Sequence, residues 1–498
     1  MALPGEEPGS GRVPGGGSLR SLAARGTLVN SGFTVAFSAL SLLKGFILAA
    51  FLSRSDYGVW GIVVVSVGTL VWLKQVGIGD KYVQQDEDDQ EAAFQKAFTL
   101  ELGFTTILVV MLLAAIPLFV LLYDTPELIA PSLVVAVSLL VSVFQAPLWI
   151  YYRRMNFVRQ RVLQGVDPVV GFIVSVALAV MGAGYWAFVG GLVAGVAAAS
   201  LASVVNSPFR LRLRYDPGTL RSYVRFSWPL FLAGGSSVLM VQTAVVVAND
   251  HLGLAATGVI ALAATITSFT DKMDELVTGT LYPAICAVKD NVALLYESFV
   301  KSNRLALMWA VPFGVGVTLF CADIVNFGIG SRWEPAIGVL QVYGVAAAFN
   351  HVGFNWTAYF RARDETRPIA VANFAALIAF LAVGIPLILT FGLEGFAVGI
   401  AFQGLVHLAV RAFYMQRLFH GFGFARHAAR AFAPTLPAVG VVLALRALEP
   451  GGRTLELALG ELALYLGVTA AVTWYLEAPL LREAVGYVFG GRTAKVAA

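Results

Sequence analysis

Long runs of apolar residues, separated by short polar or basic segments, make up most of this chain. A helix that crosses a bilayer needs about 20 mostly apolar residues, and the runs reach that length repeatedly. We therefore predict an all-α polytopic membrane protein with about fourteen transmembrane helices. The predicted spans are 26–51, 57–76, 97–122, 127–151, 163–182, 185–207, 224–249, 256–278, 303–325, 336–359, 368–390, 393–415, 430–447 and 455–478.

The basic residues predict how the chain is oriented. With a cytoplasmic N-terminus, alternate loops collect most of the Lys and Arg residues on the inner side. The outer loops then hold only Arg54, Arg332, Arg446 and Arg453. Short cytoplasmic loops carry an excess of basic residues. We therefore expect an even number of spans in the cell (cytoplasmic) membrane, with both termini cytoplasmic.

An internal repeat predicts two lobes. Tyr57-Gly58 matches Thr257-Gly258, and GYWAFVGG (Gly184–Gly191) resembles GLEGFAVG (Gly392–Gly399). Six predicted spans separate the copies, so the copies share one orientation, and parallel repeats imply an axis along the membrane normal. The expected organisation is a disordered cytoplasmic tail (1–25), a first six-helix lobe (26–209), a cytoplasmic linker (210–223), a second six-helix lobe (224–420), two further spans (421–482) and a cytoplasmic tail (483–498).

Composition narrows the function. The chain is 58% hydrophobic and 13% charged, whereas soluble domains carry about 25% charged residues. The net charge of +4 does not indicate nucleic-acid binding, because the basic residues lie in short loops between spans. Cys286 and Cys321 form neither a disulfide framework nor a metal-ligand pattern. Motifs such as HExxH, paired CxxC and GxSxG are missing, so we predict no enzyme and no cofactor.

The first span carries a polar stripe. Six residues fall within roughly 140° of each other on a helix, opposite an apolar face: Asn30, Ser31, Thr34, Ser38, Ser41 and Lys44. A cation in the middle of a span is costly unless it meets a water-filled cavity or a partner inside the bundle. We predict that Lys44 lines a cavity and binds the phosphate of an anionic cargo. The alternative is that Lys44 reaches the surface or pairs with a neighbouring carboxylate.

A second candidate is the charged cluster at the end of span eight. Asp271, Asp274 and Glu275 share one helix face, with Lys272 beside them. Four charges so close together will not face lipid. They form either a cavity patch that couples an ion or contacts sugar hydroxyls, or a neutralised set of salt bridges between helices.

Span ten combines amides with aromatic rings. Asn350, His351, Asn355 and Trp356 suit sugar recognition, because amides bind hydroxyls and an indole face stacks on apolar sugar surfaces. The alternative is hydrogen bonding within the bundle. The same alternative is favoured over cavity lining for the weaker candidates Gln242, Asn249, Gln403, His407 and Lys96 with Glu101.

Five stretches, in this order, resemble the polysaccharide transporter branch of the MOP superfamily, the Wzx-like lipid-linked oligosaccharide flippases. They are FLSRSDYGVWGI (Phe51–Ile62), GIGDKYVQQDED (Gly77–Asp88), APLWIYYRRMNF (Ala146–Phe157), GYWAFVGG (Gly184–Gly191) and LYPAICAVKDN (Leu281–Asn291). The resemblance implies a V-shaped, MATE-like pair of six-helix lobes with two extra C-terminal helices. It also implies alternating access and a cationic central cavity, with Lys44 at the position of a cavity cation.

The activity implied by the resemblance is transfer of a polyprenyl-(pyro)phosphate-linked oligosaccharide from the inner to the outer leaflet, for surface polysaccharide biosynthesis. The implied partners are this substrate, membrane lipids, a polysaccharide polymerase and glycosyltransferases, with no nucleic acid. A proton or sodium gradient is a candidate driving force. The deep cations are few (Lys44, Lys272 and Lys96), which leaves room for a glycolipid less charged than a peptidoglycan precursor.

Other functions are weighed against the flippase. The alternative on the same fold is a cation-coupled drug or metabolite exporter, which typically relies on a carboxylate in the first span, where this chain has Lys44 and no acid. A glycan polymerase or ligase would be expected to carry a large outer loop, and the longest expected here, Val325–Pro335, is short. A scaffold protein is not expected to carry a polar stripe with an intramembrane lysine, because burying that charge is costly and scaffolding does not require it.

Overall fold

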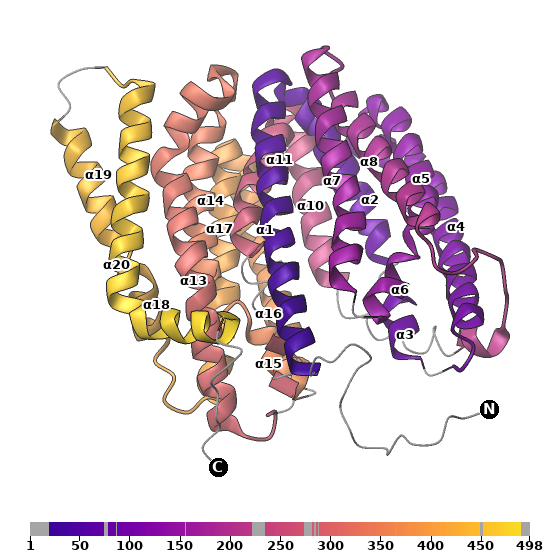
Figure 1. The fold of residues 1–498 in the computed structure, drawn as a ribbon. Helices are drawn as coiled ribbons and strands as arrows, with labels where there is room; N and C mark the ends of the chain where they lie inside the picture. The colour runs from indigo at the N-terminus through magenta and orange to yellow at the C-terminus, as the bar shows by residue number, and fades with distance from the viewer. Residues whose placement is uncertain are drawn as a thin grey trace.

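The computed structural model describes residues 19–73, 78–85, 87–154, 156–221, 235–272, 281–282, 285–286, 288–363, 365–448 and 452–489. Within these ranges every regular element is a helix. The first lobe comprises α1 Leu19–Phe51, α2 Arg54–Leu73, α3 Ile78–Gln84, α4 Gln90–Tyr123, α5 Ile129–Ser142, α6 Leu148–Arg153, α7 Phe157–Val180 and α8 Trp186–Val205. Figure 1 shows the long helices standing side by side.

The rest of the chain forms a second lobe and a C-terminal extension. The second lobe comprises α10 Gly235–Leu252, α11 Leu254–Thr267, α13 Val292–Asp323, α14 Ala336–Asn350, α15 Trp356–Ala362, α16 Arg367–Ala379 and α17 Ile385–Leu418. The extension comprises α18 Phe424–Phe432, α19 Leu436–Leu448 and α20 Leu455–Phe489. The lobe boundaries predicted from the sequence stay predictions.

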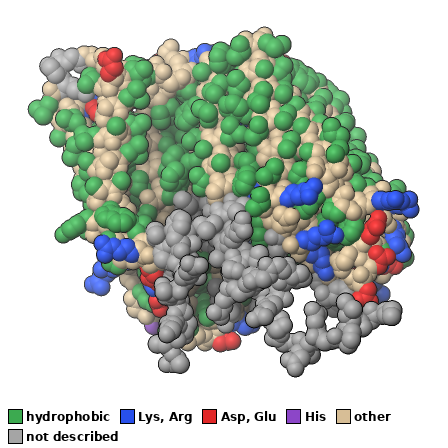
Figure 2. Space-filling view, in the orientation of Figure 1, with side chains coloured by type: hydrophobic (Ala, Val, Ile, Leu, Met, Phe, Trp, Pro, Cys, Tyr) green, Lys and Arg blue, Asp and Glu red, His purple; other side chains and the backbone are tan. Residues whose placement is uncertain are grey.

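The surface and the helix lengths are those of a multi-pass membrane protein. Figure 2 shows hydrophobic side chains over most of one face, with Lys and Arg gathered mainly toward its lower edge. Among the described residues, eight helices are long and apolar enough to cross a membrane, or nine if the bent pair α18–α19 is one span. One of the eight is the 52-residue run Arg367–Leu418. A straight helix of that length would measure about 78 Å, against about 30 Å of hydrocarbon. The backbone breaks within the run at Gly392, whose φ is +63°, between the predicted spans 368–390 and 393–415. The all-α fold class is confirmed, while the total of fourteen spans stays a prediction.

The two lobes meet where α2 packs against α11. A Cβ on Gly58 would lie 2.2 Å from the Leu254 carbonyl oxygen, and one on Gly258 would lie 1.8 Å from the Arg54 carbonyl oxygen. The contact is reciprocal, because each glycine admits the first turn of the other helix. Reciprocal contacts of this kind are expected when two repeats face each other across a two-fold axis. The structure therefore places the repeated Gly58 and Gly258 at the pseudo-symmetric centre of the molecule.

Cross-lobe hydrogen bonds close the molecule at the end where α1 stops and α2 begins. Arg332 donates to the Ala50 carbonyl at 2.6 Å, and the Trp333 indole donates to the Ala49 carbonyl at 2.8 Å. The last carbonyls of a helix have no hydrogen-bond donor within the helix, so the guanidinium supplies donors that these carbonyls would otherwise lack. Across the pseudo-two-fold axis, the amide of Asn249 donates to the Tyr123 carbonyl at 2.8 Å. We call these contacts of Arg332, Trp333 and Asn249 the outer closure, because the orientation predicted from the loop charges puts this end outside.

Two weaker cavity candidates take part in this interface. Asn249 belongs to the outer closure, and Gln242 donates to the Tyr123 hydroxyl at 2.8 Å. The favoured interpretation of both, as interhelical hydrogen-bonding residues, is confirmed. Lys96 pairs with Glu87 at 2.8 Å, which gives this lysine a local carboxylate partner.

A buried charge network attaches the C-terminal extension to the second lobe. Arg453 lies 2.6 Å from both Asp323 of α13 and Glu461 of α20. Arg446 joins the same two carboxylates at 3.1 and 3.0 Å. Further along α13, Arg304 pairs with Glu477, and Lys301 lies 2.7 Å from Glu483. Because α20 is tied to α13 at several points, the extension is fixed to the second lobe along the length of α13.

Candidate functional site

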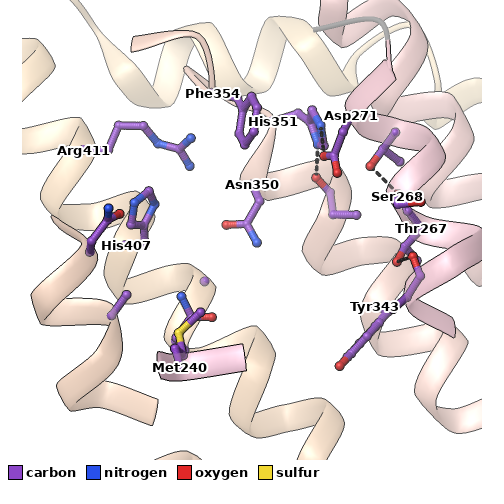
Figure 3. Close-up of a pocket in the computed structure, with 17 residues that line it drawn as sticks. Met240, Thr267, Ser268, Asp271, Tyr343, Asn350, His351, Phe354, His407 and Arg411 are labelled. Atoms are coloured by element: carbon purple, nitrogen blue, oxygen red, sulfur yellow. Dashed lines mark hydrogen bonds and ion pairs between the residues drawn. The ribbon is translucent and has the colours of Figure 1, made fainter. Parts of the chain in front are cut away.

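A cavity of about 390 Å³ with polar side chains in its wall lies in the second lobe, lined by α10, α11, α14, α16 and α17; we call it the polar cavity. Its polar lining combines one carboxylate, three amides, two imidazoles and one guanidinium: Asp271, Asn350, Asn373, Gln403, His351, His407 and Arg411. Met240, Tyr343 and Phe354 add apolar surface. Figure 3 shows Arg411 and His407 on one side, Asp271 and His351 on the other, and Asn350 between them.

A break in the helix after α14 aims His351 into this cavity. The chain turns over residues 351–355 before α15 begins, and Gly353 adopts a φ of +75° that favours glycine. Asn303 of α13, which is fully buried, holds the turn from behind. Its amide donates to the His351 carbonyl at 3.0 Å, and its oxygen accepts from the Gly353 amide at 2.9 Å. A broken span thus presents its side chains at the cavity wall, as discontinuous helices do in transporters.

His351 and Asp271 face each other at the cavity wall. The His351 Nδ1 atom contacts the Ala347 carbonyl at 2.7 Å, and a carbonyl only accepts, so Nδ1 carries hydrogen. The other ring nitrogen, Nε2, lies 3.0 Å from Asp271 Oδ1. This is an ion-pair distance, although the two atoms are not aligned for a hydrogen bond.

The opposite wall comes from one face of α17. Gln403, His407 and Arg411 are spaced four residues apart and therefore line up along the helix. Arg411 is 1% exposed, although its side chain is charged. A guanidinium binds phosphate oxygens through paired hydrogen bonds, and amides both donate to and accept from hydroxyl groups. The cavity is therefore suited to a ligand that carries hydroxyls together with an anionic group.

The structure brings together only part of the predicted site. Asn350, His351, Asp271, Gln403 and His407 all line the cavity. Asn355 and Trp356 are buried outside the lining. Asn355 donates to the Ser302 hydroxyl at 2.7 Å, and Trp356 packs edge-on against Phe360. Lys272 is half-buried next to Asp271, whereas Asp274 and Glu275 lie outside the described residues.

The polar stripe of α1 faces the junction between the lobes and does not line this cavity. Phe37 packs where a Cβ on Gly165 of α7 would be, and Gly45 faces Thr265 of α11 at 3.4 Å. At 100° per residue, Ser41 points between these two directions, and it is exposed. Thr34 is half-buried and Ser38 is buried. The stripe thus lies along the junction between the first lobe and the second.

Lys44 has an electrostatic partner within its own lobe. The lysine is half-buried on α1 and interacts electrostatically with the carboxylate of Asp167 on α7. Pairing with a neighbouring carboxylate was the alternative considered for this residue, and the partner was not predicted. The phosphate-binding role of Lys44 stays a prediction.

The cavity residues that sequence reasoning missed include Asn373, Tyr343 and Arg411. Arg411 was assigned to the basic cytoplasmic loops. Its four-residue spacing from His407, itself four residues after Gln403, was the available signal, because such spacing marks one helix face.

Comparisons with known proteins agree with this architecture. The lipid II flippase MurJ in an inward closed conformation has a TM-score of 0.66 at 13% identity, covering 91% of this chain and 99% of MurJ. An inward-facing MATE transporter of the MOP superfamily scores 0.63 at 15% identity, covering 78% of this chain and 98% of the transporter. At such identities the likeness shows the fold, which is the two-lobed MOP architecture expected from the sequence.

Sequence comparison identifies the family. The succinoglycan biosynthesis transport protein ExoT of Rhizobium meliloti (strain 1021) is 22% identical over 309 residues, which is 59% of this chain. The match spans 61% of the length of that relative. A family profile described as "Polysaccharide biosynthesis protein" matches residues 47–338, more than half of the chain. The chain belongs to the polysaccharide biosynthesis protein family.

Proposed function

We propose that this protein is a flippase that moves a lipid-linked oligosaccharide, carried on a polyprenyl phosphate or pyrophosphate, from the inner to the outer leaflet. The observation that carries the proposal is the cavity of the second lobe, where amides and a guanidinium are held inside a membrane-embedded bundle. Hydroxyls and phosphate are the groups that such a lining binds. The family, and the transport role in the name of ExoT, support the same process.

The described conformation corresponds to one half of an alternating-access cycle. The outer closure and the Gly58–Gly258 contact hold the lobes together at one end. Substrate therefore enters from the opposite side, where α1 begins and where the basic loops predict the cytoplasm. Release to the outer leaflet requires that the outer closure break and that the lobes separate at this end.

The energy source in this account is a proton. The proposed coupling site is the His351–Asp271 pair, 3.0 Å apart at the cavity wall, where uptake of a proton would hold the two groups together and its loss would remove that attraction. The two groups would then move apart, which changes the wall that contacts the substrate. Binding and proton release are coupled because both act on the same few side chains. Sodium dependence with no proton dependence would overturn this part of the proposal.

The localisation follows from the same account. The protein acts in the cytoplasmic membrane with both termini inside, where lipid-linked sugars are assembled. Glycosyltransferases that build the substrate and a polymerase that consumes it are the expected functional partners. An exporter of cationic drugs is disfavoured, because Arg411 lies in the wall of the cavity and repels a cation.

Surface glycan display in cells that lack the chromosomal gene tests the proposal. Gln403→Leu and Asn373→Leu each remove a cavity amide at similar size, and both should lower display to about a tenth or less. Gln416→Leu makes the same exchange at an exposed position of α17 and should leave display unchanged. Equal display by all three variants, at equal amounts of protein in the membrane, would contradict the proposal.

A further inference from the structure

An apolar groove of about 410 Å³ lies on the second lobe between α14 and α17. Val342, Val345, Ala346 and Phe349 line one wall, and Ala401 and Leu405 line the other. Val345, Phe349 and Leu405 are between 38% and 54% exposed. In a membrane protein such exposed apolar side chains face lipid chains, so the groove is open to the hydrocarbon of the bilayer.

The first lobe carries the equivalent groove. It has a volume of about 260 Å³ and lies between α5 and α8. Each of its seven lining residues pairs with a lining residue of the second groove 208 positions later, for example Val134 with Val342 and Val193 with Ala401. The same spacing separates GYWAFVGG from GLEGFAVG. Both grooves therefore descend from the internal repeat, and the first is a natural control for the second.

Only one residue lining the second groove has no counterpart in the lining of the first. That residue is Asn350, which also lines the polar cavity. A Cβ on Gly404 would lie 2.6 Å from the Asn350 amide nitrogen, so this amide packs against α17 at the boundary between the two hollows. On one side of Asn350 lies the polar cavity, and on the other lies a groove open to lipid.

The positions behind the two grooves differ in chemistry. The second lobe has Gln403, His407 and Arg411, where the repeat places Gly195, Ala199 and Ser203 in the first lobe. The small residues of the first lobe let its helices pack tightly. A Cβ on Gly191 of α8 would lie 1.8 Å from the Ser175 hydroxyl of α7. A polar cavity therefore adjoins the second groove, while close helix packing lies behind the first.

We propose that the α14–α17 groove binds the first isoprene units of the carrier lipid while the phosphate and sugar occupy the polar cavity. The inference rests on the proposed flippase function and specifies where the substrate's apolar chain lies. An amphiphilic ligand needs an apolar surface that meets a polar one, and the two hollows meet at Asn350. A chain held in the groove stays in contact with hydrocarbon, so only the head group leaves the lipid.

Chain-length dependence of binding tests the groove. The probes are farnesyl phosphate and undecaprenyl phosphate, which carry the same head group on a short and a long isoprenoid chain. Affinity for the purified full-length protein in detergent is measured by native mass spectrometry. We expect the wild type to bind the long probe at least about tenfold more tightly than the short one, because more apolar surface is buried.

Two matched variants test which of the two grooves produces the preference for the long chain. Ala401→Phe fills the second groove and should abolish the preference for the long chain. Val193→Phe makes the equivalent change in the first groove and should preserve it. Both positions lie at a lipid-facing groove, so neither variant introduces a polar group or a core cavity. Asn350→Ala removes the shared amide and should weaken binding of both probes while keeping the preference for the long one.

Other results would overturn either the groove assignment alone or the flippase proposal as well. A preference that survives Ala401→Phe, or that is lost equally in Val193→Phe, overturns the groove assignment and leaves the flippase proposal standing. Equal competition by dioleoylphosphatidylglycerol also overturns the assignment, because the groove would then be a site for ordinary lipid. If the wild type binds neither isoprenoid phosphate, the proposed function fails and the groove assignment fails with it.

Discussion

At the scale of single residues, the His351–Asp271 pair carries the strongest chemical constraint in the structure. Asn303 fixes the turn that presents His351, and the Ala347 carbonyl fixes which ring nitrogen carries hydrogen. The remaining nitrogen lies 3.0 Å from Asp271, and this contact is the basis of the proposed proton coupling. Among the described residues, Lys272 lies next to Asp271 in the sequence, and Tyr343, His407 and Arg411 line the same cavity.

Replacing His351 by glutamine should uncouple transport from the proton gradient. Glutamine offers its carboxamide to Asp271 but takes up no proton at physiological pH, so substrate movement should continue without gradient stimulation. The measurement is glycolipid movement in proteoliposomes with and without an imposed pH gradient. His420→Gln, in the exposed loop between α17 and α18, is the control that keeps the stimulation. Undiminished stimulation in His351→Gln would exclude this pair from coupling.

Residue types alone predicted some of the cavity residues. Whether a polar or aromatic residue of span ten reaches the cavity depended on how the chain turns in three dimensions. Asn350 and His351 were candidates because amides combined with aromatic rings suit sugar recognition, and the structure places both at a cavity. The same argument selected Asn355 and Trp356, yet a turn of the chain buries them against α13 and α15. Hydropathy does not reveal where a span breaks, so the sequence alone did not separate the two pairs.

At the scale of elements, three of the arginines in the predicted outer loops connect helices to one another. Arg332 satisfies carbonyls at the end of α1, and Arg446 and Arg453 bind the carboxylates of Asp323 and Glu461. These residues were predicted only as the few basic residues outside. The charge of the loops predicts the orientation of the chain in the membrane. The ion-pair partner of each arginine depends on which helices pack together, and the spacing of residues along the chain does not reveal those neighbours.

Substituting Arg332 by alanine should open the outer side more often. The change removes hydrogen bonds from a charged group to the Ala50, Phe51 and Leu52 carbonyls, and such a bond contributes about 1.5–3 kcal/mol. The population of the open state should rise about tenfold or more. Labelling of a Ser41→Cys reporter by a membrane-impermeant maleimide added outside intact cells measures this opening, with Cys286 and Cys321 replaced.

Arg54→Ala is the matched control for this experiment. It removes another outer arginine without touching the outer closure, and labelling should stay at the level of the parent reporter. If Arg332→Ala were labelled no faster than Arg54→Ala, the outer closure would not be what holds this side shut.

At the scale of the whole molecule, two repeats share a backbone plan but differ in what they enclose. The paired glycines at the α2–α11 contact and the equivalent lipid-facing grooves preserve the symmetry. The polar cavity breaks it, because the second lobe holds a glutamine, a histidine and an arginine where the first holds small residues. The repeat and the two-lobed fold were predictable from hydropathy and motif spacing. The asymmetry was not, because it depends on how closely α7 and α8 pack.

The central claim is that the cavity of the second lobe binds the head group of a lipid-linked oligosaccharide during its transfer. The most direct test is the rate at which a polyprenyl-pyrophosphate-linked oligosaccharide crosses the bilayer of proteoliposomes, followed by its accessibility to an external glycosidase. Wild type and Gln416→Leu should transfer it at equal rates, and Gln403→Leu should be slower by about tenfold or more. Equal rates for all three proteins, or no transfer by the wild type, would contradict the account.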